Sequence, residues 1–149
     1  MLKLIAIGSR LMKDDGIAAA VVENIKDKLE FLGFEVIISE TDFQYSFHLL
    51  KEEDVLVLVD ADYTGNTPGS IHVYDLQEAA CRYKRTCSQH ELSIFDLVRQ
   101  YSKPLNGYLI GIEIAESGFG VKLSETLLGK FDDICIEVER IIRELVKGV

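Results

Sequence analysis

Residues 4–16 read LIAIGSRLMKDDG, an apolar run that breaks at a glycine and continues through a loop to two aspartates. The uninterrupted run at residues 4–7 is typical of a strand that is covered on both faces of a mostly parallel sheet. Gly8 allows the sharp exit from this strand that a residue with a Cβ would resist. We expect Asp14 or Asp15 to cap the helix that follows. Because a cap needs only one carboxylate, the second aspartate points to chemistry at this place.

The remainder of the chain alternates between strand and helix patterns. Apolar residues recur at helical spacing over residues 17–32, up to Gly33, and again on one face from Ser124 onward. Strands are predicted at residues 34–38, 55–59, 70–74 and 105–112, and shorter helices at residues 43–51 and 88–101. This order predicts one domain over residues 1–149, a three-layer α/β/α sandwich with a mostly parallel sheet of about five strands. The strand at 70–74 should run antiparallel, because the connection before it is too short for a helical crossover.

Composition excludes several classes of function. With 149 residues, 48% of them hydrophobic, the chain can fill one core. Its net charge of -9 argues against a nucleic-acid or anionic-membrane surface. No apolar run approaches the roughly 20 residues that cross a bilayer, and no signal peptide is recognisable at the amino end. Cys81, Cys87 and Cys135 lack C-x-x-C spacing and are expected to be reduced structural thiols of a cytoplasmic protein.

The candidate functional residues are those that follow apolar runs, because ligands of open α/β sheets bind beyond the carboxyl ends of the strands. The pair Asp14-Asp15 follows the first strand by a loop, Asp60 ends the run at 55–59, and His90 opens a helix after a polar loop. Two carboxylates and an imidazole can bind a divalent metal and leave a position open. Each also has a structural reading: Asp15 as a helix cap, Asp60 as a turn former, and His90 as a surface residue. His48 and His72 are read as structural.

The sequence contains none of the common catalytic motifs that we considered. The chain has no Gly-x-Ser-x-Gly elbow, Walker loop or H-E-x-x-H, so a nucleotide cofactor lacks a visible cradle. Paired aspartates, Asp60 and the later Lys103-Pro104 suggest a phospho-accepting receiver domain. The order argues against that alternative: a receiver needs its acidic pair directly at the strand end and its Lys-Pro after the last strand.

Four segments together resemble the hydrogenase maturation proteases, the endopeptidases that trim the large subunit of nickel-iron hydrogenases. They are IGSRLMKDDG at 7–16, VDAD at 59–62 leading to Pro68-Gly69, SQHELS at 88–93, and GIE at 111–113 leading to Leu123-Ser124. Carried over by position, the family's metal-binding and catalytic residues are Asp15, Asp60 and His90. Two segments depart from the family: Ser9 stands where asparagine is common, and residues 39–43 replace a glycine-rich turn.

The resemblance implies a cytoplasmic peptide hydrolase without a permanent cofactor, expected to be a monomer. It would sense nickel in the precursor of a [NiFe] hydrogenase large subunit and remove a C-terminal extension. Either a carboxylate activates water as a general base or the metal polarises the carbonyl. The alternative is a non-catalytic, metal-dependent binding or chaperone module on the same fold.

Overall fold

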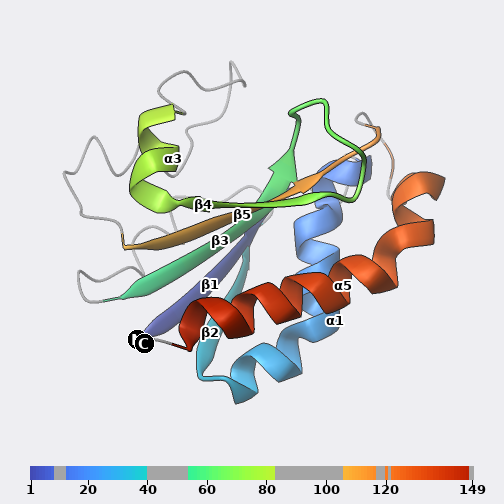
Figure 1. Cartoon of the computed structure of the whole chain (residues 1–149). Helices are drawn as coiled ribbons and strands as arrows, with labels where there is room; N and C mark the ends of the chain where they lie inside the picture. The colour runs from blue at the N-terminus through green and yellow to red at the C-terminus, as the bar shows by residue number, and fades with distance from the viewer. Residues whose placement is uncertain (9–12, 40–53, 83–105, 117–119, 121, 148–149) are drawn as a thin grey trace.

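Five strands and three α-helices make up the part of the chain that the computed structural model describes, residues 1–8, 13–39, 54–82, 106–116, 120 and 122–147 (Figure 1). In chain order the elements are β1 (Leu2–Ile7), the 3-10 turn η1 (Lys13–Gly16), α1 (Ile17–Phe31), β2 (Phe34–Ser39), β3 (Val55–Asp62), β4 (Ile71–Asp75), α3 (Leu76–Arg82), β5 (Gly107–Glu113) and α5 (Glu125–Val146). The helices predicted at residues 43–51 and 88–101 lie outside the described residues.

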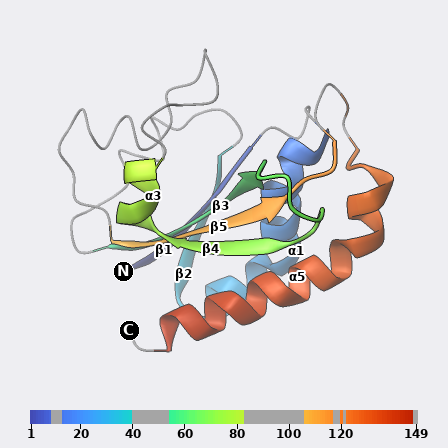
Figure 2. The ribbon, with the colours of Figure 1, turned by 45° about the horizontal axis from the view of Figure 1, so that its top comes forward.

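The strands form one sheet in the order β2-β1-β3-β5-β4. All neighbours pair in parallel except β4, which runs antiparallel to β5. Helices α1 and α5 lie on one face of the sheet and the short α3 on the other (Figures 1 and 2). The predicted α/β class, the five strands and the antiparallel strand are therefore confirmed.

The strand run at residues 55–59 is longer in the structure than its apolar residues suggested. β3 continues to Asp62, because Asp60, Ala61 and Asp62 pair with Gly111, Ile112 and Glu113 of β5. Sequence reasoning ended this strand at Asp60, where the apolar residues stop. Pairing with β5 therefore extends β3 by two residues beyond Asp60 and places both aspartates within the strand.

The main core lies between the sheet and the helices α1 and α5. Val57 and Val59 of β3 are fully buried in it, together with Leu4 and Ala6 of β1. Cys135 of α5 is a buried free thiol in the same core. Burial, with a smaller contribution from Asp132, raises the pKa of the Cys135 thiol to about 11, so it stays protonated at neutral pH and is a poor nucleophile.

At the opposite end of the sheet from the candidate site, a buried ion pair ties the start of β1 to the start of β3. Lys3 Nζ lies 2.9 Å from Asp54 Oδ2, and the two side chains are only 5% and 3% exposed.

None of the described helices combines the length and the apolar character needed to pass through a membrane.

Candidate functional site

The carboxyl ends of β1, β3 and β5 meet at one edge of the sheet, beside η1 and the beginning of α1 (Figures 1 and 2). Gly8 is the first residue after β1 and has φ +136°, a conformation that L side chains rarely adopt. A Cβ at this position would lie 2.0 Å from the backbone carbonyl oxygen of Asp15. The glycine therefore lets η1 approach the end of β1 at backbone distance, which brings the two aspartates to this edge.

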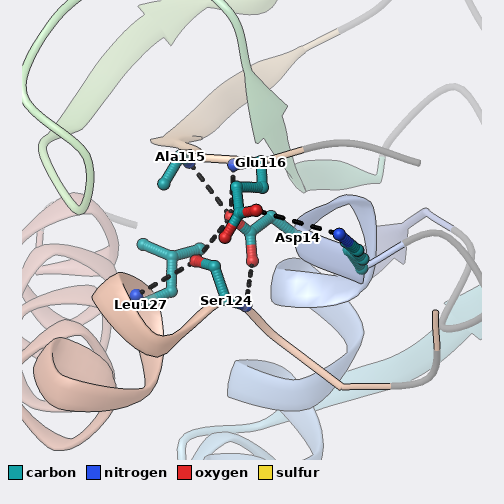
Figure 3. A network of polar contacts seen from close by, with 6 residues as sticks. Asp14, Ala115, Glu116, Ser124 and Leu127 are labelled. Atoms are coloured by element: carbon teal, nitrogen blue, oxygen red, sulfur yellow. Dashed lines mark hydrogen bonds and ion pairs between the residues drawn. The ribbon is translucent and has the colours of Figure 1, made fainter. Parts of the chain in front are cut away.

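The N-cap position of α1 is Gly16, so neither aspartate occupies it, contrary to the expectation that Asp14 or Asp15 would be the cap residue. Asp14 is fully buried and directs its carboxylate to the segment that leads into α5 (Figure 3). There, capping is performed by Ser124, whose hydroxyl accepts a hydrogen bond from the Leu127 N–H.

Four donors converge on the Asp14 carboxylate. Oδ1 accepts from the Ser124 N–H at 2.7 Å, and Oδ2 accepts from the Ser124 hydroxyl at 2.8 Å. Oδ2 also accepts from the N–H groups of Ala115 at 3.0 Å and Glu116 at 2.7 Å (Figure 3). A buried carboxylate with this many donors is well compensated for its loss of water. Asp14 therefore fixes η1, the end of the β5 segment and the start of α5 relative to one another.

Asp15 has a different environment from its neighbour. It is half-buried, and its Oδ1 accepts a hydrogen bond from the hydroxyl of Tyr63. Tyr63 is the residue directly after β3, and η1 contacts this strand. The contact thus brings Asp15 of the first loop to the carboxyl end of β3.

Asp60 lies within β3, two residues before the strand ends at Asp62. Ala61 and Val59 pack on the core beneath α1 and α5, so Asp60 faces the other side of the sheet because successive strand residues alternate. Its Oδ1 accepts a hydrogen bond from the Ala61 N–H at 2.8 Å. The backbone contact expected of a turn former is therefore present, although the residue belongs to the strand.

His90, the third predicted ligand, lies outside the described residues. Within the part of the chain that is described, no group of three or more His, Cys, Asp or Glu side chains could hold a metal ion. Only Asp15 and Asp60 of the predicted set belong to that part. The convergence of all three side chains on one metal ion stays a prediction.

Sequence reasoning assigned no role to two buried acids near the same edge. Glu113 is 2% exposed and accepts hydrogen bonds from the N–H groups of Thr64 and Asn66 at 3.0 and 3.3 Å and from the Thr64 hydroxyl. Burial alone would raise the pKa of Glu113, but these hydrogen bonds outweigh it and lower the pKa. Glu113 thereby holds the loop between β3 and β4.

His72 contacts the Asn66 side chain at 3.2 Å, which agrees with its structural reading.

Asp62 is the second of these acids and is 7% exposed. Its Oδ1 accepts from the Tyr63 N–H and its Oδ2 from the Tyr74 hydroxyl, both at 3.0 Å. Gly111 of β5 leaves room for it, since a Cβ there would lie 2.6 Å from Asp62 Oδ2. Both acids stand in the segments quoted above, at 59–62 and 111–113, but only their hydrogen-bond partners show what they do.

The chain has the fold of a class of α/β proteins of which several structures have been solved. Over 97% of its length the chain is similar to the hydrogenase maturating endopeptidase HybD from E. coli, of which 93% is covered, with a TM-score of 0.77 and 19% identity. It is similar over 94% to a [NiFe] hydrogenase maturation protease HybD from Thermococcus kodakarensis, covering 97% of that chain, with a TM-score of 0.67 and 20% identity. The HycI protease of Thermococcus kodakarensis KOD1 gives a TM-score of 0.68 at 20% identity, over 98% of this chain and 92% of that one.

The family follows from the sequence model rather than from these structures, whose low identities show the fold alone. The family model "HycI: Hydrogenase maturation protease" matches residues 19–141. The chain therefore belongs to the hydrogenase maturation protease family, as its four quoted segments suggested. No curated protein gives a significant match.

Proposed function

We propose that this chain is an endopeptidase that removes a C-terminal extension from the nickel-loaded precursor of a [NiFe] hydrogenase large subunit. The observation that carries the proposal is family membership, together with the two described acids at the carboxyl edge of the sheet. Asp15, Asp60 and His90 are the residues assigned to the precursor's nickel. Carboxylate oxygens and an imidazole nitrogen are ordinary ligands of a divalent transition metal.

In this proposal the nickel is part of the substrate and acts as the recognition signal. Ligands from the protease complete the coordination of an ion that the precursor already holds, and this docking brings the scissile peptide bond to the edge of the sheet. Hydrolysis then adds water across that bond: a C–O bond forms, the C–N bond breaks, and the leaving amine takes up a proton. A precursor without nickel would lack the docking contact and would stay uncut.

The test incubates the protein with nickel-loaded and nickel-free precursor and weighs the products by mass spectrometry. We expect loss of a C-terminal peptide only from the nickel-loaded form. Binding of the loaded precursor without any loss of mass would contradict the protease assignment and identify a non-catalytic binding module instead.

Variants of the assigned residues test the site. Asp15→Asn, Asp60→Asn and His90→Ala should abolish cleavage. Two controls match them in chemistry: Asp133→Asn removes an exposed carboxylate of α5, and His72→Ala removes the histidine that contacts Asn66. Both controls should cleave at nearly the wild-type rate. Full cleavage by any of the first three variants would remove that residue from the site.

A further inference from the structure

Tyr63 is an exposed aromatic residue whose backbone is held on both sides. Its own N–H donates to Asp62 Oδ1 at 3.0 Å, and the N–H of the next residue, Thr64, donates to the buried Glu113 at 3.0 Å. The residue is nevertheless 62% exposed. A large ring is therefore presented to solvent from a fixed piece of backbone at the end of β3.

The hydroxyl of Tyr63 turns back to the Asp15 carboxylate, 48 residues earlier in the chain. A hydrogen bond to one oxygen of a metal-binding carboxylate restricts the orientation in which that group meets its metal. Partners of this kind typically change metal affinity or activity by 10–100-fold when they are removed. Because this hydrogen bond is exposed, we expect an effect near the lower end of that range.

The ring of Tyr63 has the properties of an interface anchor. Tyrosine combines a large apolar area with few rotatable bonds, and tyrosines are enriched among the residues that dominate binding energy. The exposed ring lies directly beside the carboxylate that, in the proposed function, meets the precursor's nickel. A surface of the precursor close to its nickel would therefore reach this ring at the same time as it reaches Asp15.

We propose that Tyr63 positions the Asp15 carboxylate through its hydroxyl and contacts the nickel-loaded large subunit through its ring. The inference rests on the proposed function and adds a residue to it. The two roles belong to different atoms of one side chain, so they can be separated by substitution. Without the hydroxyl, Asp15 is still present as a nickel ligand but is less well oriented, so the docked peptide bond should be misplaced and the turnover step should be affected. Loss of the ring should also affect precursor binding.

The test measures kcat and KM for cleavage of nickel-loaded precursor by Tyr63→Phe and Tyr63→Ala. Tyr63→Phe should lower kcat about tenfold and leave KM within about twofold of wild type. Tyr63→Ala should lower kcat similarly and raise KM about tenfold, because the anchor is lost as well. Thermal unfolding of both variants should match the wild type, since the side chain is largely exposed.

Tyr74→Phe is the matched control. Its hydroxyl also donates to a carboxylate, Asp62 Oδ2 at 3.0 Å, but that acid is not assigned to the nickel. We expect kcat and KM within about twofold of wild type for this control. A wild-type kcat for Tyr63→Phe would overturn the positioning role, and a wild-type KM for Tyr63→Ala would overturn the contact with the precursor. If the wild-type protein leaves the loaded precursor uncut, the proposed function fails first, and the role of Tyr63 fails with it.

Discussion

Replacing Asp14 by asparagine tests whether this residue organises the candidate site. The side chain is fully buried and accepts four hydrogen bonds, two of them from Ser124. Asparagine has nearly the same shape but carries one oxygen in place of two, and no charge. With its oxygen in the place of Oδ2, the variant keeps three of the four donors. Its amide nitrogen then faces the Ser124 N–H, and because both groups are donors, no hydrogen bond forms between them.

The cost can be worked out from these contacts. A hydrogen bond to a charged group contributes about 1.5–3 kcal/mol, and a neutral one about 1 kcal/mol. Loss of the bond from the Ser124 N–H therefore costs about 2 kcal/mol. Loss of charge weakens each of the three remaining bonds by about 0.5–1 kcal/mol. Allowing for relaxation, Asp14→Asn should lower the free energy of unfolding by about 3–4 kcal/mol, and the Tm by about 10 °C.

Urea denaturation followed by circular dichroism measures this difference directly. Asp133→Asn provides the control, because it makes the same chemical change at an exposed position of α5 and should alter stability by less than about 0.5 kcal/mol. If Asp14→Asn proved as stable as Asp133→Asn, the network around Asp14 would not hold η1 against the start of α5, and the reasoning would be wrong.

Three further changes test other parts of the structure. Gly8→Ala places a Cβ 2.0 Å from the Asp15 carbonyl oxygen at φ +136°; it should cost about 2–4 kcal/mol in urea denaturation and abolish cleavage, and a stable, active variant would contradict the close approach. Lys3→Met removes the nearer cation of the buried Asp54 and leaves the Met1 ammonium, 3.7 Å from Asp54 Oδ1; we expect about 2 kcal/mol of destabilisation by the same measurement, and a change below about 1 kcal/mol would show that the pair is dispensable. The pKa of Glu113 is lowered below its usual value of 4.5, so its stabilisation is present above pH 4.5 and is lost as the pH falls through the lowered pKa. Glu113→Gln should therefore flatten the loss of stability below pH 4.5, and an unchanged acid profile in thermal melts would refute this.

The secondary structure of the described residues was largely readable from local patterns, except for two short elements, the 3-10 turn η1 and the helix α3. The longer of the two, α3, has seven residues and is too short to show a helical period. Its start did carry a signal, since Asp75 Oδ1 accepts from the N–H groups of Gln77 and Glu78 at 2.9 and 3.3 Å. An aspartate followed by good helix formers could have revealed it.

By itself, the sequence determined the strands, the two long helices, the antiparallel strand and the family, because apolar periodicity, turn residues and ordered motifs are local properties of the chain. Only the tertiary structure showed that Asp14 and Asp15 have separate hydrogen-bond partners. The two residues are adjacent and chemically identical, yet Asp14 binds backbone groups about a hundred residues away and Asp15 receives the Tyr63 hydroxyl. The partner of a side chain depends on which distant segments the fold brings together, and local spacing does not record that. The same holds for Glu113, whose donors in the loop after β3 became visible only once β3 and β5 were paired.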